Sequence, residues 1–355
     1  MAADDIASGD VSISAYNPLS NNEFPKMTHL NTSAWELWFF DAVSSTDDAA
    51  ITLSFFRDGS GTRMGKGSLR TQVHVVWPDG ETFGTEVDAG ESVIEACPGD
   101  VIKASWHGKD GGSTSFEVSQ NLKEATVRLD LPAMQGDLTL SSVAPAFPND
   151  GDTDPSTNIS PILAPTIHWL QPIPIASVSV SVTISGKELS FTGTGGHDRF
   201  WTPYSWMTLM DESYYMRTVA GPFTLVLLRI ISRVNPGRTY VSAYLFEEGR
   251  RVFASQNDNI SLEDDYVSFK LSHLGNVRGD YKDTNTGYVV DLVAPAKGKH
   301  WRFELEHQSI WWNHPTGPVT GNTGFIDKVT GGECGGERHE GAGSSGQCQL
   351  PPSAK

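Results

Sequence analysis

Large aromatic rings and charged side chains are interleaved in one segment of the chain, residues 195–231. After the pair Gly195–Gly196, the rings and charged groups are Phe200, Trp201, Tyr204, Trp206, Tyr214 and Tyr215, with His197, Asp198, Arg199, Asp211, Glu212 and Arg217. Rings with polar tips around a concavity are typical of a small-molecule pocket. An aromatic-rich core beneath a long loop has the same composition, so the segment alone leaves both interpretations open.

A carboxyl group stands among rings in the stretch WELWFFD, residues 35–41. On a strand, Glu36 shares a face with Trp38 and Phe40, and we expect this face to point inward because exposing both rings is costly. Burial would raise the pKa of Glu36 and let it donate a hydrogen bond. On an outward face, Glu36 would be an ordinary solvated acid.

The stretch QVHVVW, residues 72–77, alternates polar and apolar side chains. Val73, Val75 and Trp77 form the expected core face, which leaves Gln72 and His74 on the other face. These two side chains either line a cavity or lie in water.

Adjacent polar groups elsewhere are weaker candidates. His197 and Asp198 would point to opposite faces of a strand, so they do not form a dyad, and Asp198 after the turn-prone glycines is more typical of a turn. Of the adjacent Trp311 and Trp312, one is expected in the core and the other in a pocket. Lys328 is either an anion contact or a solvated lysine.

Composition excludes several classes of function. The 355 residues include 26 Lys and Arg and 43 Asp and Glu, a net charge of −17, which disfavours nucleic acid and anionic membranes as partners. Cys97, Cys334 and Cys348 lack CxxC spacing, which argues against zinc and against a disulfide framework. We find no nucleotide or metalloprotease motif, and therefore expect no cofactor.

Membrane and secretion signals are also missing. The first ten residues, MAADDIASGD, have neither the basic nor the apolar part of a signal peptide, and no apolar run reaches about 18 residues. We expect a cytoplasmic protein without a membrane span.

Hydrophobic periodicity predicts strands throughout. Residues 72–77, 178–184 and 301–306 alternate with period two, and turn signals rich in Gly, Pro and Asn recur between such stretches. The sequence therefore predicts an all-β chain of many short strands, a sandwich or a barrel. Residues 147–166 are expected to form a linker, and the Gly/Ser-rich tail from Thr330 to be partly mobile.

Several long motifs occur in one order: WELWFFDAVS (35–44), QVHVVW (72–77), GGHDRFWTPYSW with ESYYMRT (195–218), YKDTNTGYVV (281–290), IWWNHPTG (310–317), GNTGF (321–325) and EGAGSSGQCQL (340–350). This pattern resembles the fungal decalin-forming Diels–Alderases of polyketide–tetramate pathways, and more distantly the carotenoid 1,2-hydratase-like proteins. The resemblance implies an N-terminal β-sandwich over residues 1–170, a C-terminal lipocalin-like β-barrel over residues 171–355, and a pocket between them. It also implies cofactor-free cyclisation of a linear polyenoyl tetramic acid, released by a polyketide synthase–nonribosomal peptide synthetase, to a decalin.

The resemblance also implies roles for particular residues. Glu36, Gln72 and His74 would be catalytic, by donating a hydrogen bond to the carbonyl that activates the dienophile. The substrate-binding candidates are Trp38, Trp201 or Trp206, Tyr214 or Tyr215, and Trp312. An acidic tetramate headgroup would be bound by a cation or N–H donor such as Lys328, His168 or Asn313. His168 stands where the family pattern leads us to expect an aromatic residue such as tyrosine.

Two other classes of function remain open at this stage. A lipocalin-like carrier of an apolar metabolite would use the same aromatic pocket without catalysis. A polyene hydratase or isomerase would use acid chemistry at His197–Asp198. A carbohydrate-binding sandwich is a third, less supported interpretation of the tryptophans.

Overall fold

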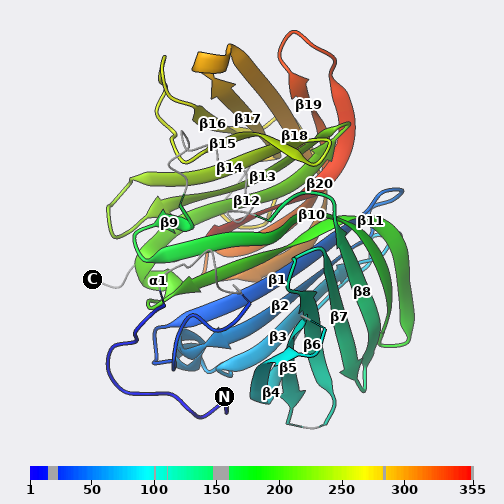
Figure 1. The fold of residues 1–355 in the computed structure, drawn as a ribbon, viewed down its shortest axis with the longest axis vertical. Coiled ribbons are helices and arrows are strands. Elements are labelled where there is room, and N and C mark those ends of the chain that lie inside the picture. The colour runs from blue at the N-terminus through cyan, green and yellow to red at the C-terminus, as the bar shows by residue number, and fades with distance from the viewer. Residues whose placement is uncertain (15–22, 100, 110, 147–159, 283–284, 353–355) are drawn as a thin grey trace. The chain divides into compact units, whose positions relative to one another are not determined.

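The computed structural model describes residues 1–14, 23–99, 101–109, 111–146, 160–282 and 285–352 (Figure 1). Contacts between Cα atoms divide the chain into two compact units. Unit 1 contains Met1–Asp152 and Thr166–Ser205, and unit 2 contains Thr153–Pro165 and Trp206–Lys355. The boundary predicted after residue 170 falls inside a strand, Ile167–Ile184, whose long pairings with Met134–Ser142 and Lys187–Thr202 are both within unit 1.

Unit 1 is built from long antiparallel strands joined by tight connections. Its strands are β1 (Trp35–Ser44), β2 (Ala50–Asp58), β3 (Leu69–Val76), β4 (Thr82–Cys97), β5 (Val101–Gly108), β6 (Ser113–Ser119), β7 (Glu124–Leu131), β8 (Met134–Ser142), β10 (Ile167–Ile184) and β11 (Lys187–Thr202). They pair in the order β11-β1-β2-β3-β4-β5-β6-β7-β8-β10. Because β11 also pairs with β10, the sheet closes on itself, as in a barrel.

Aromatic side chains fill the interior of unit 1. The ring of Trp38 on β1 lies 5.5 Å from that of Trp106 on β5, and Phe40 lies 5.2 Å from Phe116 on β6. Phe55 on β2 contacts Trp106 at 5.0 Å. Side chains of β1 and β2 thus pack against those of β5 and β6, which is the sandwich-like core expected from sequence.

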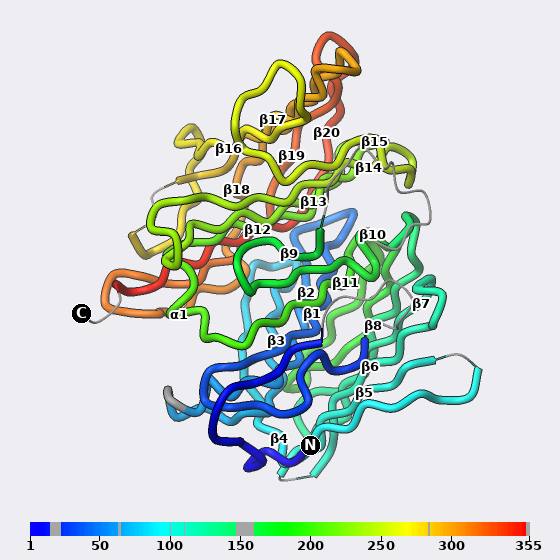
Figure 2. The backbone as a smooth tube through the Cα atoms, turned by 60° about the vertical axis from the view of Figure 1, so that its left-hand side comes forward, coloured from blue at the N-terminus to red at the C-terminus, as the bar shows by residue number. Residues whose placement is uncertain are grey.

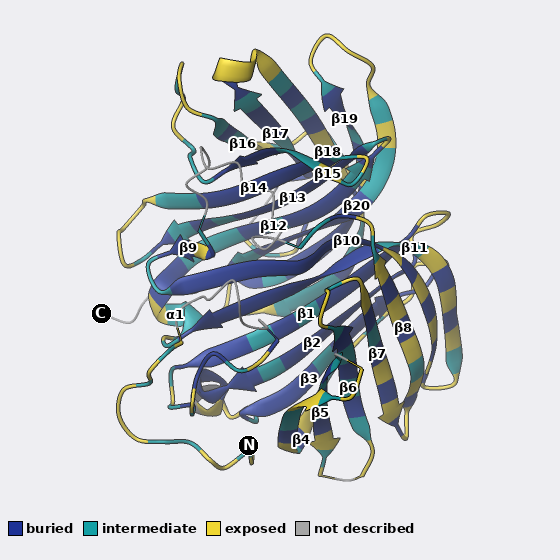
Figure 3. Ribbon diagram, viewed as in Figure 1, coloured by how far each residue is buried: buried dark blue, intermediate teal, exposed yellow. Residues whose placement is uncertain are grey.

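The burial pattern distinguishes two parts of this sheet (Figure 3). β7 and β8 alternate buried and exposed residues, whereas nearly every residue of β1 is buried or half-buried. The same holds for β2 and β3 and for the first half of β10. Polar side chains on either face of these strands are therefore shielded from water.

Gly195 lies within β11 and not in the turn that the sequence analysis expected. Its register partner is Ala42 on β1, and a Cβ atom at position 195 would lie 2.0 Å from the carbonyl oxygen of Asp41. Gly193 approaches the carbonyl oxygen of Val43 in the same way, at 1.9 Å. The turn prediction is wrong because these glycines permit a close approach of two strands.

Before β1, the N-terminal segment runs alongside the strands of unit 1, where Figure 2 shows it in dark blue. Isolated bridges join Ala2 to Glu91, Ile6 to Leu30 and Ile13 to Met27. A short 3-10 helix, η1 (Gly59–Met64), follows β2. The segment places Glu23, Lys26 and Met27 among buried side chains of the unit.

Unit 2 is a second antiparallel sheet. Its elements are α1 (Trp206–Leu209), β12 (Met210–Ala220), β13 (Phe223–Ser232), β14 (Thr239–Glu247), β15 (Arg250–Ser255), β16 (Tyr266–Ser272), β17 (Gly287–Ala294), η2 (Pro295–Lys297), β18 (Lys299–Pro315), β19 (Gly321–Glu333) and β20 (His339–Gln349). The strand order is β15-β14-β13-β12-β20-β19-β18-β17-β16, and the strongly curved sheet encloses its own apolar core. The predicted all-β fold class is confirmed, and each of the two units is a barrel-like sheet.

The tail from Thr330 is part of this sheet, so its predicted mobility is wrong. β20 pairs with β12 on one side and with β19 on the other. A Cβ atom at Gly341 would lie 2.0 Å from the carbonyl oxygen of Val219, which explains why small residues are needed here. The Gly/Ser composition reflects close strand packing and not disorder.

The predicted linker is described only in part. Residues 147–159 lie outside the described residues, and Ile162–Ala164 form the short strand β9. Within the ranges that the structure describes, we find no helix long and apolar enough to cross a membrane.

Candidate functional site in the first unit

Glu36 lies on the inner face of unit 1, as predicted. Its register partners are Arg57 on β2 and Trp201 on β11, and the next residue on the same face is the core residue Trp38. Only 1% of Glu36 is exposed. The alternation of β1 therefore puts a carboxyl group at the end of a stripe of aromatic rings.

Both carboxyl oxygens of Glu36 accept hydrogen bonds. Oε2 accepts from the backbone N–H of Lys26 at 2.9 Å and from Nη2 of Arg199 at 3.1 Å, and Oε1 accepts from the N–H of Met27 at 3.3 Å. The structure thus places Glu36 as an acceptor, and neither oxygen is positioned to donate as the sequence analysis expected. Ionised carboxylates are acceptors only.

Arg199 is the buried partner that holds this carboxylate. Its guanidinium carbon lies 3.7 Å from the centre of the Trp38 ring, a cation–π contact, and it also donates to the carbonyl oxygen of Leu37 at 3.1 Å. Burial lowers the pKa of Arg199, while the charges of Glu36 and Glu23 oppose that change. The planar guanidinium satisfies several acceptors at once.

A second acid–base pair continues the cluster. His197 Nε2 lies 3.0 Å from Glu23 Oε2, and its Nδ1 lies 3.0 Å from the carbonyl oxygen of Phe39. The ring stacks on Phe40 with centroids 4.0 Å apart. Burial alone would raise the pKa of Glu23, but the neighbouring His197, Arg199 and Lys26 charges lower it below its ordinary value. Two hydrogen-bond acceptors and the stacked ring of Phe40 therefore fix the position of the His197 ring.

Lys26 has the most strongly perturbed amine in this region. Burial and the nearby Arg199 charge lower its pKa to about 8, against the attraction of Glu23 and Glu36. Its Nζ lies 5.8 Å from the centre of the Trp201 ring. Amines with a pKa near neutrality are often found in functional sites, although buried ionic clusters produce the same effect.

His168 and Trp201 form the wall beside this cluster. They are register partners on β10 and β11, and their rings stack at 4.7 Å with an interplanar angle of 10°. Burial lowers the pKa of His168. Trp201 belongs to a small apolar cluster with Leu170, Met27 and Leu30. The structure therefore brings together four predicted site residues: Glu36, Trp38, His168 and Trp201.

Gln72 and His74 do not join them. Gln72 pairs with Ser54, and Ser54 with Phe39, so this row lies on the opposite face of the sheet from Glu36. His74 is 5% exposed, and Gln72 is half-buried. The three catalytic residues predicted from sequence therefore do not share a face. Glu36 points to one side of the sheet, and Gln72 and His74 point to the other.

The predicted residues of unit 2 are more dispersed. Tyr214 and Tyr215 point to opposite faces of β12: Tyr214 is buried against Phe269 and donates from its hydroxyl to Glu212 at 2.9 Å, whereas Tyr215 is half-buried. Trp206 is half-buried on α1.

Trp312, Asn313 and Lys328 lie on β18 and β19. The ring of Trp312 covers Gly324 and donates from Nε1 to Asn322 at 3.2 Å, while Trp311 is buried, as expected for one tryptophan of the pair. Asn313 donates to Asp280 at 2.6 Å. The side chain of Lys328 is 51% exposed and forms an ion pair with Glu340 at 3.4 Å.

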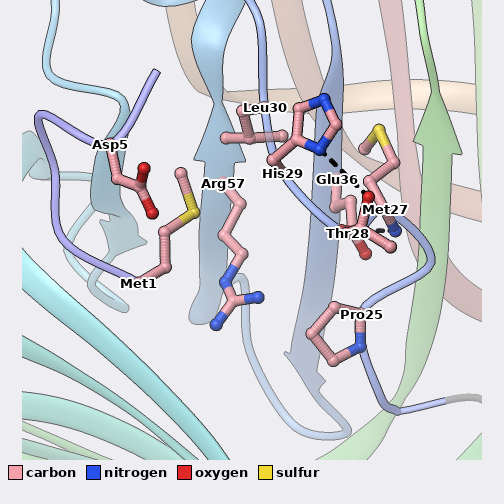
Figure 4. Close-up of a pocket in the computed structure, with 9 residues that line it drawn as sticks. All are labelled: Met1, Asp5, Pro25, Met27, Thr28, His29, Leu30, Glu36 and Arg57. Atoms are coloured by element: carbon pink, nitrogen blue, oxygen red, sulfur yellow. Dashed lines mark hydrogen bonds between the residues drawn. The ribbon is translucent and has the colours of Figure 1, made fainter. Parts of the chain in front are cut away.

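One cavity opens beside Glu36 within unit 1 (Figure 4). Its volume is about 330 Å³. The residues that line it come from the N-terminal segment, β1 and β2: Met1, Asp5, Pro25, Met27, Thr28, His29, Leu30, Glu36 and Arg57. No sequence pattern indicated Arg57 as a site residue, or Arg199 as the partner of Glu36, which is 163 residues away in sequence.

Comparison with known proteins decides the family. The family model described as Diels-Alderase-like matches residues 1–351. The chain belongs to this family. The Diels-Alderase mpsD of Macrophomina phaseolina is 35% identical over 97% of this chain and 90% of the relative. The Diels-Alderase fsa2 of Fusarium heterosporum is 33% identical over 95% of this chain and 94% of the relative.

The fold agrees with a solved structure. The crystal structure of CghA superimposes with a TM-score of 0.87 at 30% identity, covering 99% of this chain and 97% of CghA. This Diels-Alderase-like protein is therefore an enzyme that catalyses a Diels–Alder cyclisation. The resemblance inferred from the motifs is confirmed.

Proposed function

We propose that the substrate of this enzyme is a linear polyenoyl tetramic acid, which it folds and cyclises to a decalin without a cofactor. The observation that supports the proposal most is the family match along residues 1–351. In an intramolecular Diels–Alder reaction three π bonds of one molecule are replaced by two carbon–carbon σ bonds and one new π bond, and no atom is lost. The product therefore has the mass of its precursor.

Shape is the main catalytic requirement of such a reaction. The barrier of a flexible polyene consists largely of the entropy lost when the diene meets the dienophile, and holding reactants in the reactive geometry can contribute about 7–11 kcal/mol. Favouring one diastereomer 10-fold requires only about 1.4 kcal/mol between competing transition states. We propose that the half-buried rings of Trp206, Tyr215 and Trp312 contact the polyene and provide this discrimination.

Activation of the dienophile needs a hydrogen-bond donor beside its conjugated carbonyl. A donor there stabilises the negative charge that develops on oxygen in the transition state. We assign this role to Gln72, with His74 as its neighbour on the same face, because both oxygens of Glu36 already accept hydrogen bonds. Within the described ranges, the Gln72 side chain makes no hydrogen bond, so its amide is available.

In this proposal, a structural role falls to four buried residues, which stabilise the unit that carries Gln72 and His74: Glu36, Trp38, His168 and Trp201. The acidic headgroup of a tetramate would be bound by N–H donors, for which Asn313 and Lys328 are the remaining predicted candidates. We further propose that the substrate is released by a polyketide synthase–nonribosomal peptide synthetase and that cyclisation takes place in the cytoplasm.

Incubation of the purified protein with a linear polyenoyl tetramate tests the proposal. We expect faster consumption than in buffer, a product of unchanged mass, and one dominant decalin diastereomer. A carrier would change neither the rate nor the product ratio. A hydratase would yield a product heavier by one water.

A further inference from the structure

Arg57 is a buried cation with few partners. It lies on β2 opposite Glu36 and is 8% exposed. Its Nε donates to Ser92 Oγ at 3.0 Å. Among the described residues, neither of its Nη nitrogens has a hydrogen-bond acceptor, and no carboxylate forms an ion pair with it.

The carboxylate nearest in the sheet is already engaged. Glu36 accepts from Arg199 and from two backbone N–H groups, so it attracts Arg57 through space without bonding to it. Burial lowers the pKa of Arg57, and the charge of Glu36 opposes this change. The Nη groups of Arg57 are not sealed from water, because they reach a cavity. An anion in that cavity would offer them a charged acceptor, which forms stronger hydrogen bonds than water does.

The unsatisfied groups face a cavity. Figure 4 shows the Arg57 guanidinium directed into the space of about 330 Å³ that Glu36 also borders. The wall of the cavity is apolar at Pro25, Met27 and Leu30, and it is polar at Thr28 and His29. This volume lies near the lower end of small-molecule pockets, about 300–1,000 Å³.

We propose that this cavity is a binding site for a small organic monoanion. A carboxylate or enolate would accept two hydrogen bonds from the Nη nitrogens of Arg57, the geometry that guanidinium groups favour. The apolar part of the ligand would pack against Met27 and Leu30.

The charge of the walls limits the ligand further. Asp5 and Glu36 both border the cavity, so a phosphate or another multiply charged anion would meet repulsion there. Because Glu36 is already paired with Arg199 and Asp5 is exposed to water, the Arg57 guanidinium remains to balance a ligand with a single negative charge. The site goes beyond the cyclisation and does not depend on it, because it requires only the geometry within unit 1.

Calorimetric titration of the full chain with hexanoate at pH 7 tests the proposal, with hexanamide as the uncharged probe of equal length. We expect saturable hexanoate binding with a Kd on the order of 1 mM. Hexanamide should bind about 10-fold more weakly or worse, because hydrogen bonds to a charged acceptor are the stronger ones.

Variants locate the binding. Arg57→Gln should weaken hexanoate binding about 10- to 100-fold, whereas Arg57→Lys should retain part of it. Thr28→Trp, at an exposed rim position, should block the cavity with the core intact. Arg128→Gln, which removes a surface arginine that is 55% exposed, should bind as the wild type does.

Three results would overturn the inference: no hexanoate binding by the wild type up to 20-fold above the expected Kd, equal affinities for hexanoate and hexanamide, or unchanged affinity in both Arg57→Gln and Thr28→Trp. Thermal melting of each variant identifies misfolding, and Thr28→Trp keeps the test decisive if Arg57→Gln does not fold. Cyclisation assays in parallel separate this site from the proposed function, since loss of hexanoate binding is expected with cyclisation retained.

Discussion

Replacement of Glu36 by Gln distinguishes a structural acceptor from a catalytic donor. The wild-type carboxylate accepts from Lys26 N, Met27 N and Arg199 Nη2. A glutamine has one acceptor oxygen, so its amide nitrogen must face one of these donors wherever the group is flipped. At least one buried donor then loses its acceptor, and Arg199 loses its opposite charge.

The expected cost follows from these contacts. Leaving one buried donor unsatisfied costs about 1–3 kcal/mol, and breaking a buried ion pair by changing one partner costs about 3–5 kcal/mol in all. For a domain of 150–250 residues, about 2–4 °C of Tm is lost per kcal/mol, so unit 1 should melt about 6–20 °C lower. Calorimetry or urea denaturation measures this loss.

A double-mutant cycle isolates the pair. Arg199→Met should destabilise to a similar degree, and Glu36→Gln with Arg199→Met should cost less than the sum by about 1–3 kcal/mol. Lys328→Met is the matched control, because it removes an exposed ion pair and should change the free energy of unfolding by less than about 1 kcal/mol.

The activity of Glu36→Gln completes the comparison. At a temperature where the variant is folded, we expect its cyclisation rate to stay within about threefold of wild type. Unchanged stability together with a rate about 100-fold lower would refute the structural role and restore Glu36 as the catalytic donor.

Three further predictions concern other parts of the chain. Gln72→Leu should lower the cyclisation rate about 10-fold or more while Gln72→His retains part of it, as measured by single-turnover kinetics; equal rates would exclude Gln72 as the donor. Trp312→Ala should lower the rate and erode the diastereomer ratio together, which chiral chromatography of the product measures. The pKa of Lys26 falls from its ordinary 10.5 to about 8, so the folded chain holds fewer protons than the unfolded chain between these values. Stability relative to Lys26→Met should therefore rise between about pH 8 and about pH 10.5, and on acidification this gain should be lost over the same interval, so that none remains below about pH 8. A difference that does not change with pH would contradict the shift.

Sequence patterns predicted the parts of this structure that depend on local alternation. The period-two stretches predicted strands that the structure has as β3, β10 and β18. The inward direction of Glu36 on β1 followed from its spacing to Trp38 and Phe40. The opposite orientation of His197 and Asp198 followed in the same way: His197 pairs with Phe40 and Asp198 with Phe39. These inferences need only the geometry of a single strand.

Features that depend on distant neighbours could not be predicted. The partner of Glu36 is Arg199, on a strand far along the chain, and its presence reverses the hydrogen-bonding role expected for the acid. The pair Gly195–Gly196 is typical of a turn, but Gly195 instead lies within β11 and lets this strand approach β1 closely. Glu36 and Gln72 lie on opposite faces because of the register of β1, β2 and β3. Neither of the two sequence stretches alone determines that register.

The rate and product of cyclisation test the central claim most directly. Purified wild-type protein is mixed with a linear polyenoyl tetramate, and mass spectrometry with chiral chromatography follows the products against a buffer control. The account predicts accelerated formation of one decalin diastereomer with the mass of its precursor. An uncatalysed rate with an unchanged diastereomer ratio would contradict it.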